Sequence, residues 1–452
     1  MKSLWKEQTK EIVAKSDIDT DGNDSIHWDV IVVGAGMAGL LIAYYLQEQG
    51  KQVLILEAAQ IASGQTERTT AKITSQHDLK YSKLIRKVGV KKAKLYARAN
   101  EEAINEYERL IQKLGIKCDF KRLSSYLYTQ RDKKMLWEEA QAAAYLGIHT
   151  SIASEAELPF PVTGVTCFHN QAQFSPLEFV KEIAKELNIC EGIRVLKIKG
   201  KRVFTRDKVF EADKIVVATH YPIRNVPGFY FLRQHQERSY VLALSGAGKL
   251  EGMYKGIDKD GISLRQAGEY ILLGGSSHRT GKNKTGGAYA FLEEKATEYF
   301  PGCKIEAMWS AQDCMPHDGI PFIGKYSIFT PSLYVATGFQ KWGMTSSMVA
   351  AMILKEELCG RRSPYSEVFS PQRLNIRAGI KDFLKDVGES AIGLTKGVFH
   401  LKGPRCPHMG CELVWNPDEH SWDCPCHGSR FEEDGKLRDN PAKRGTDKNI
   451  AK

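Results

Sequence analysis

Trp28-Asp29-Val30-Ile31-Val32-Val33-Gly34-Ala35-Gly36-Met37-Ala38-Gly39 is the stretch of sequence that decides the fold. Residues 28–33 form a short, mostly apolar run that is typical of a buried parallel strand, and three glycines follow at once. Apolar residues at helical spacing continue from Leu40 to Leu46, and Gly50 ends that segment. A second apolar run, residues 52–56, ends on Glu57. The order strand, glycines, helix, strand, acid predicts a βαβ dinucleotide-binding unit.

Each fingerprint residue has a physical task in such a unit. Gly34 permits the tight turn, Gly36 lets the backbone approach a pyrophosphate, and Gly39 lets helix and strand pack closely. The N-terminus of the helix faces the phosphates. Glu57 can accept hydrogen bonds from ribose hydroxyls. We therefore expect Gly34, Gly36, Gly39 and Glu57 to bind a dinucleotide.

The sequence contains one good copy of this fingerprint. Gly246-Ala247-Gly248 is followed by Lys249, Leu250 and Glu251, lacks a helical pattern, and is typical of a hairpin turn. A flavoprotein reductase that uses a pyridine nucleotide would carry a second dinucleotide fold. The single copy favours a tightly held FAD that is reduced by a substrate binding directly to the flavin domain.

Composition limits the class of protein. The chain has 452 residues, of which 42% are hydrophobic and 26% charged, as in globular proteins. The net charge of +10 is scattered among acids, so we expect no nucleic-acid partner. The N-terminal residues are polar without an apolar core, and no run approaches the roughly 18 apolar residues of a membrane span. We expect a cytoplasmic protein without a membrane span.

Four of the ten cysteines crowd into one C-terminal stretch together with two histidines. In an intracellular chain such a cluster indicates a metal more often than a disulfide framework. Cys406-Pro407-His408 and Cys424-Pro425-Cys426-His427 each offer a thiolate and an imidazole on a tight loop. Two thiolates suit one iron of a [2Fe–2S] cluster and two imidazoles suit the other. Tetrahedral zinc is the alternative for two Cys and two His.

Residues 28–360 resemble the FAD-dependent amino-acid and amine oxidase superfamily, which includes glycine oxidase and γ-glutamylputrescine oxidoreductase. The matching stretches are residues 29–39, 63–72, 214–219, 309–313 with 318–324, and 333–338 with 342–345. The late stretch also predicts a strand ending near Gly338 and a helix from about Met344 to Leu358, whose N-terminus can stabilise negative charge on a reduced flavin. The resemblance implies FAD binding by further residues, namely Thr70, Lys72, Gly338, Gly343, Met344 and Thr345.

The C-terminal stretch resembles the Rieske family. The resemblance implies Cys406, His408, Cys424 and His427 as cluster ligands. It also places Cys411 and Cys426 where high-potential Rieske proteins have a disulfide, and here a disulfide and two free thiols both remain open. A phenylalanine, Phe431, stands where those proteins have a hydrogen-bonding tyrosine, so we expect a potential in the lower or middle Rieske range.

These observations predict a mixed α/β chain. An FAD-binding, doubly wound, Rossmann-like domain spans residues 28–360, with an inserted antiparallel substrate-domain sheet mainly within 150–330. A polar extension (1–27) precedes it, and a linker (361–396) with one helix near 376–384 follows. A small all-β Rieske-type module occupies 397–452. With one strand at 397–401 before its loops and a polar tail, this module is too short to shield its cluster alone, so it must pack on the flavin domain or on a partner.

The two cofactors together indicate an FAD-dependent dehydrogenase. It would oxidise a C–N bond of a small-molecule amine or amino acid by hydride transfer to flavin, and electrons would leave singly through the cluster to an unidentified acceptor. No catalytic residue is assigned; the candidates near the flavin are His278, Arg279, Gln340 and Lys341. A reductase running in reverse and a non-enzymatic redox sensor are the alternatives. A Rieske oxygenase is disfavoured because no separate two-His-one-carboxylate iron site is evident.

Overall fold

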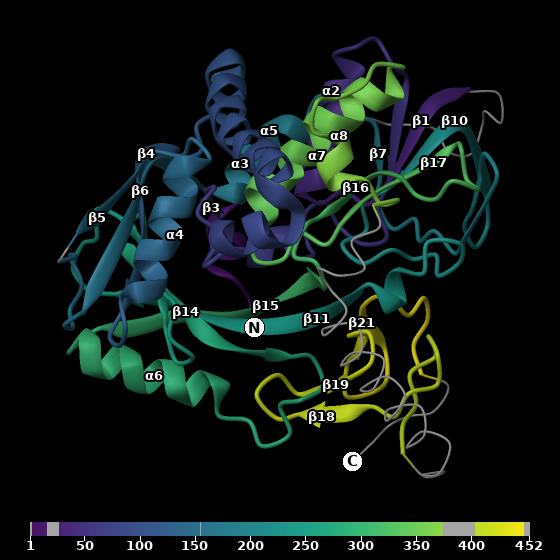
Figure 1. Cartoon of the computed structure of the whole chain (residues 1–452). Helices are drawn as coiled ribbons and strands as arrows, with labels where there is room; N and C mark the ends of the chain where they lie inside the picture. The colour runs from purple at the N-terminus through teal and green to yellow at the C-terminus, as the bar shows by residue number, and fades with distance from the viewer. Residues whose placement is uncertain (1, 16–26, 154, 374–402, 447–452) are drawn as a thin grey trace.

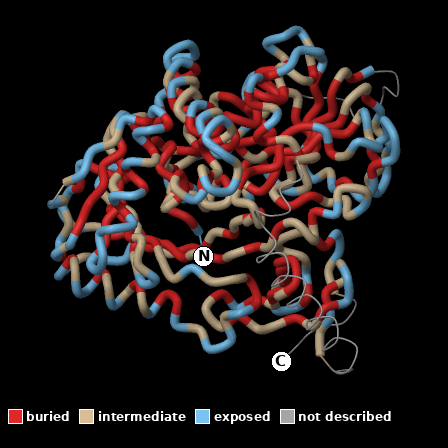
Figure 2. The backbone as a smooth tube through the Cα atoms, in the orientation of Figure 1, coloured by how far each residue is buried: buried red, intermediate tan, exposed pale blue. Residues whose placement is uncertain are grey.

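The computed structural model of the chain describes residues 2–15, 27–153, 155–373 and 403–446. The helix expected near 376–384 and the strand expected at 397–401 lie outside these ranges. Two large sheets and a small third one carry the described chain (Figure 1). Figure 2 shows that the buried residues follow the two large sheets and the helices between them.

The first large sheet is the predicted dinucleotide-binding core. Its main path runs β16-β17-β10-β1-β2-β7, in which every pair except the antiparallel β16-β17 is parallel. The bounds are β1 Trp28–Val33, β2 Val53–Leu56, β7 Ile189–Cys190, β10 Val209–Val217, β16 Phe322–Lys325 and β17 Leu333–Thr337, with β8 Lys197–Lys199 and β9 Arg202–Phe204 attached at β10. Because its central strands are covered on both faces, they consist almost entirely of buried Val, Ile and Leu.

Helices cover this sheet and connect it to the rest of the molecule. α2 (Met37–Gln47) and α7 (Gly343–Leu358) pack against each other, and the long α3 (Tyr81–Leu114), kinked at Gly89, packs against α7. The other helices are α1 Leu4–Gln8, α4 Lys134–Tyr145, α5 Pro176–Ala184, α6 Ala288–Tyr299 and α8 Ser366–Phe369, with short 3-10 turns at Thr66–Arg68 and Tyr230–Leu232. α1 belongs to the expected polar extension, yet Leu4 and Trp5 are buried, and the Trp5 indole donates to the Thr69 carbonyl at 2.7 Å.

The second large sheet is the expected antiparallel insertion. Its main path is β15-β11-β14-β13-β12-β4-β6-β3, with β5 beside β6 and only the β12-β4 pair parallel. The bounds are β3 Lys72–Ile73, β4 Lys121–Thr129, β5 Thr150–Ala153, β6 Gly164–Gln173, β11 Gln234–Ser245, β12 Met253–Gly256, β13 Ser263–Ala267, β14 Tyr270–Arg279 and β15 Lys304–Pro316. β3 and β4 precede residue 150, so the sheet draws on more of the chain than the expected 150–330.

One expectation in this region was wrong. Gly246-Ala247-Gly248 does not close a hairpin, because β11 pairs with β14 and β15, whereas β12 pairs with β13 and β4. The segment is a bend that carries the chain across the sheet, with Gly246 and Gly248 at φ +68° and +82°. A glycine-rich turn shows that the chain changes direction but not which strands it joins.

The C-terminal module is a small antiparallel meander, in agreement with the all-β expectation. Its strands β18 (Val414–Asn416), β19 (Ser421–Asp423), β20 (Arg430–Phe431) and β21 (Leu437–Asp439) pair in chain order. The module lies beside β11 (Figure 1). Residues from β11 and from the segment after β14 contact it directly. The flavin domain therefore supplies shielding that the short module lacks.

Candidate active site and metal centre

The fingerprint glycines lie where β1 gives way to α2, and each has a steric reason to be glycine. Gly34 has φ +107°, and a Cβ there would lie 2.7 Å from the Ala218 carbonyl oxygen. A Cβ on Gly39 would lie 1.9 Å from the Gly34 carbonyl oxygen, so the helix could not approach the strand. A Cβ on Gly36 would meet only the Thr66 hydroxyl, at 3.3 Å. The helix N-terminus therefore faces open space at Gly36, as a bound pyrophosphate requires.

Glu57 ends β2 beside this turn. Its carboxylate accepts from the Ala35 amide at 2.7 Å and from the Ala59 amide at 2.8 Å. These two bonds fix the carboxylate at the rim of the fingerprint, where it lines the adjoining cavity. A carboxylate has about four acceptor positions, so two amide bonds leave capacity for ribose hydroxyls.

A cavity of about 310 Å³ extends from the fingerprint to the inserted sheet. Gly34, Gly36 and Glu57 line it, and so do Asp313, Lys341 and Met344. The C-terminal module closes part of its wall with Arg438, Asp439 and Asn440. The N-termini of α2 and α7 both line this cavity, and each can stabilise the negative charge of a bound FAD.

The residues implied by the oxidase resemblance fall into three groups. Gly343 and Met344 line this cavity. Gly338 and Thr345 lie behind its wall: a Cβ on Gly338 would be 2.5 Å from Pro316 Cγ, and the buried Thr345 hydroxyl donates to the Thr74 carbonyl at 3.1 Å. Thr70 and Lys72 line a second cavity that adjoins the first.

The four catalytic candidates lie in different parts of the structure. Lys341 lines both cavities and Gln340 lines the first. His278 and Arg279 line neither: the His278 ring bonds to the Tyr240 hydroxyl at 2.9 Å, and Arg279 donates to the carbonyls of Pro425 and Cys426 in the C-terminal module. Of the four candidates, Lys341 therefore lines both cavities, whereas Arg279 contacts the C-terminal module.

The second cavity, of about 110 Å³, is lined by several partly buried charged side chains. Lys72, Lys255 and Lys341 line it together with Asp313. Burial, helped by the neighbouring charges of Lys255 and Arg265, lowers the pKa of Lys72 to about 7. Burial also lowers the pKa of Lys255 and raises that of Asp313. For Lys341, the carboxylates of Asp313 and Glu237 outweigh burial and raise the pKa.

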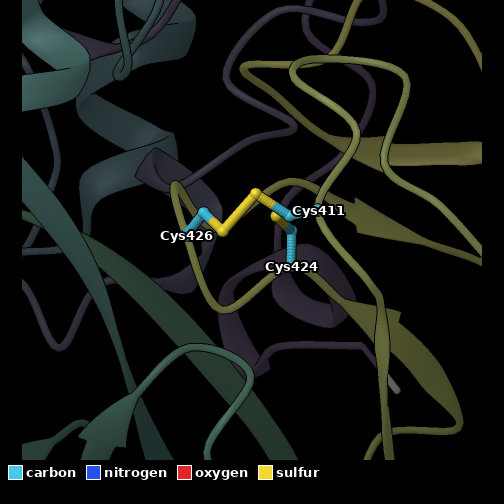
Figure 3. Close-up of side chains that lie close together, drawn as sticks. All are labelled: Cys411, Cys424 and Cys426. Carbon is cyan, nitrogen blue, oxygen red and sulfur yellow. A yellow bond between two sulfur atoms is a disulfide. The ribbon is translucent and has the colours of Figure 1, made fainter. Parts of the chain in front are cut away.

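The two cluster loops meet at the edge of the C-terminal meander. Cys406 and Cys424 are buried free thiols, whereas the sulfurs of Cys411 and Cys426 form a disulfide that staples one loop to the other (Figure 3). The rings of His408 and His427 lie 5.0 Å apart, nearly perpendicular. The Nδ1 atom of His408 is buried without a hydrogen-bond partner in the described part of the chain.

This donor set fits a Rieske cluster. Two thiols and two imidazoles converge from two loops, and the backbone of each loop repeats the same closure, in which the glycine amide donates to the cysteine carbonyl. That bond measures 2.9 Å from Gly410 to Cys406 and 3.0 Å from Gly428 to Cys424. A buried imidazole nitrogen without a partner is unfavourable unless it binds a ligand such as a metal.

Two glutamines connect the cluster loops to the flavin cavity. The Gln312 side chain lines the cavity and donates to the Gly428 carbonyl at 2.7 Å and to the Gln236 side chain at 2.6 Å. Gln236 in turn donates to the His427 carbonyl at 2.7 Å. One side chain thus touches both the cavity and the loop that carries Cys424 and His427.

Sequence reasoning missed these contacts. Gln236 lies on β11 and Gln312 on β15, and although Gln312 belongs to a matching stretch, nothing in the sequence linked either side chain to the cluster loops. Asn225, whose side chain meets the His408 ring at 2.9 Å, lies in a loop. Lys255 was missed as well. The sequence offered one signal for this residue, namely a lysine within a strand of the inserted sheet.

Comparisons with known proteins match two parts of the chain to two families. Residues 29–357 match the family model for FAD dependent oxidoreductases, and residues 383–449 match the Rieske [2Fe–2S] domain. The putative Rieske 2Fe-2S iron-sulfur protein YhfW of Bacillus subtilis is 34% identical over 92% of both chains. Among the helices that the structure describes, none is long and apolar enough to cross a membrane.

Solved structures resemble the flavin part in fold. Glycine oxidase from Geobacillus kaustophilus superimposes with a TM-score of 0.67 at 17% identity, covering 77% of this chain and 99% of the other. L-Proline dehydrogenase from P. horikoshii gives a TM-score of 0.65, also at 17% identity, with 77% and 97% covered. At this identity the likeness concerns the fold.

Proposed function

Because this chain belongs to the family of FAD-dependent oxidoreductases and carries a Rieske [2Fe–2S] domain, we propose that it is a dehydrogenase of amines or amino acids. It oxidises a C–N bond, and the cluster passes the electrons to an acceptor outside the chain. FAD supplies hydride acceptance and one-electron release, and the cluster supplies one-electron transfer.

Residues of the chain bind the two cofactors and the substrate. The α2 N-terminus would hold the pyrophosphate of FAD, and Glu57 would accept from its ribose hydroxyls. The α7 N-terminus, at Gly343, also lines the cavity, where its dipole stabilises negative charge. Cys406, His408, Cys424 and His427 hold the cluster. The second cavity receives the substrate, because it joins the first at Arg68, Asp313 and Lys341.

One observation carries the proposal: the C-terminal module forms part of the wall of the flavin cavity. Asp439 and Asn440 line the cavity directly, and Gln312 bonds the cluster loop from the cavity side. A module that served only as a structural tail would need no contact with that cavity. The arrangement favours electron exchange between the two cofactors.

The test is an anaerobic screen of amines and amino acids on the holoenzyme. Loss of the flavin absorption bands reports substrate oxidation, and a rhombic Rieske signal in the EPR spectrum reports the cluster. We expect at least one compound to bleach the flavin and to raise the EPR signal. In Cys424→Ser, which lacks a ligand, the flavin should still bleach and the EPR signal should be absent.

Other results would overturn the proposal. If no amine bleaches the flavin while the cluster remains redox-active, the sensor alternative gains support. If the reduced cluster instead feeds electrons to oxidised flavin and a substrate is consumed by reduction, the protein runs in the opposite direction.

A further inference from the structure

One loop of the flavin domain reaches a histidine of the C-terminal module. Residues 223–229 lie in the connection from β10 to β11. The side-chain oxygen of Asn225 in this loop lies 2.9 Å from Nε2 of His408, one of the four expected cluster ligands. The two residues are 183 positions apart in the chain. The flavin domain therefore gives an expected cluster ligand a polar contact that the cluster motif does not contain.

The flavin domain holds this loop in place. The Phe229 amide donates to the Asn225 carbonyl at 2.8 Å, and the Tyr326 hydroxyl donates to the Arg224 carbonyl. Gly228 packs so closely that a Cβ there would lie 2.6 Å from the buried Tyr326 ring. The backbone on which Asn225 lies is thus fixed by contacts within the flavin domain.

The two ring nitrogens of His408 have different surroundings. Nε2 faces the amide oxygen of Asn225, which can only accept a hydrogen bond. Nδ1 is buried and has no hydrogen-bond partner in the part of the chain that the structure describes. A neutral imidazole that carries its proton on Nε2 leaves the lone pair of Nδ1 available to a metal. Both observations therefore indicate the same tautomer, in which Nδ1 is the ligand atom.

The hydrogen bond on the second nitrogen of a ligating imidazole affects the metal through the ring. An acceptor at that N–H orients the ring and increases its basicity. The oxidised cluster is one charge more positive than the reduced cluster, so an imidazole bound to it donates the stronger hydrogen bond. The acceptor therefore stabilises the oxidised cluster more than the reduced one, which lowers the reduction potential.

We propose that Asn225 is a positioning residue for the cluster: it fixes the His408 ring with Nδ1 toward the iron and lowers the reduction potential. The flavin domain thereby sets a property of the neighbouring module. The effect has the same direction as the one expected from Phe431, where high-potential Rieske proteins have a tyrosine. The inference requires the Rieske cluster but not the oxidation of a C–N bond.

The test is an anaerobic redox titration of the holoprotein, in which the EPR signal measures the reduced fraction of the cluster. Asn225→Leu keeps the approximate size of the side chain and removes the acceptor, whereas Asn225→Asp keeps an acceptor and adds a negative charge. Val226→Asp is the matched control, because this neighbouring residue is 55% exposed and its replacement adds the same charge beside the imidazole contact. Iron content, flavin content and thermal unfolding show whether each variant is intact.

The applied potential is set to the midpoint potential of the original protein. In Asn225→Leu we expect the ratio of reduced to oxidised cluster to rise roughly two- to fivefold, which corresponds to part of one hydrogen bond. The ratio should fall in Asn225→Asp, and it should fall less in Val226→Asp. The g values of the EPR signal should change in Asn225→Leu and stay the same in Val226→Asp, because only the first variant releases the His408 ring.

An unchanged ratio in Asn225→Leu at full iron content would overturn the inference. Equal falls in the two aspartate variants would overturn it as well, because they would assign the effect to charge alone. If Asn225→Leu does not retain the cluster, the comparison between Asn225→Asp and Val226→Asp decides. These titrations contain no substrate, so their outcome is independent of whether the flavin oxidises amines or amino acids.

Discussion

Glu419 of the C-terminal module is the side chain on which the domain interface depends most. It is buried between Arg238 of β11 and Arg430 of β20, at 2.5 Å and 3.0 Å. Burial alone would raise the pKa of this carboxyl, but the two guanidinium groups outweigh it and hold the pKa well below its usual range. Arg430 also pairs with Asp423 and Asp439, so charge is balanced across the interface.

Removal of Arg238 should loosen the module. In Arg238→Met we expect a loss of roughly 3 kcal/mol in the free energy of unfolding, the low end for breaking a buried ion pair, because Arg430 remains. The measurement is denaturant unfolding of the holoprotein. Arg131→Met is the control: its pair with Asp260 is 65% and 60% exposed and should contribute less than about 1 kcal/mol. Equal losses in both variants would contradict the importance given to the buried pair.

The same carboxylate predicts a dependence on pH. Because the folded pKa of Glu419 is depressed, its contribution is present above the unfolded value of about 4.3 and is lost as pH falls toward the folded value. The stability difference between the original protein and Glu419→Gln should therefore be constant from pH 7 to about 5.5 and shrink below about pH 4. A difference that grows on acidification would show that Glu419 does not titrate in this way.

At the scale of elements, local patterns in the sequence predicted where several helices and strands lie, but not which distant elements they pair with. β1, α2 and β2 occur almost where the fingerprint placed them, and so do β17 and α7. The pairing of β12 with β4 and the seating of the cluster loops on β11 and β15 were not predictable, because register between distant strands depends on which faces the completed fold buries. Gly428 and Asp418 illustrate this, since both contact elements more than 100 residues away.

The two cluster loops allow a matched test of docking. Gly410 and Gly428 occupy equivalent positions with φ +83° and +82°, so alanine strains both backbones equally. A Cβ on Gly428 would lie 2.7 Å from Gln236 Cβ, whereas one on Gly410 would meet nothing within 4 Å. We expect Gly428→Ala to lower the melting temperature by several degrees more than Gly410→Ala. Equal shifts would mean that the loop is not seated on β11.

Asp418 caps a helix of the other domain. Its carboxylate accepts from the Gly287 and Ala288 amides, each at 3.0 Å, at the N-terminus of α6. Asp418→Ala should reduce stability by about 1 kcal/mol, and Asp418→Asn by less, because the asparagine oxygen can still accept from one of the two backbone amides. Hydrogen exchange of the α6 backbone amides measures the effect at the helix itself. The protection of these amides from exchange should fall in Asp418→Ala. Unchanged protection would contradict the cap.

At the scale of the whole molecule, the FAD site and the cluster site are adjacent, because residues of the C-terminal module line the flavin cavity. Both motifs were evident in the sequence because each is local, and the division into flavin domain and Rieske module followed from them. Their mutual placement was not evident: the contacts of Arg438–Lys443 with the flavin cavity involve residues without a motif. Within the described residues, the C-terminal module packs against β11 and β15 of the flavin domain.

Electron transfer between flavin and cluster inside one molecule tests the account most directly. The flavin of the anaerobic holoenzyme is reduced by a light pulse in the presence of EDTA, and the EPR signal of the reduced cluster is followed at several protein concentrations. We expect the signal to rise as the flavin is reoxidised, at a rate independent of protein concentration. A rate proportional to concentration, or a cluster that stays oxidised until a mediator is added, would contradict it.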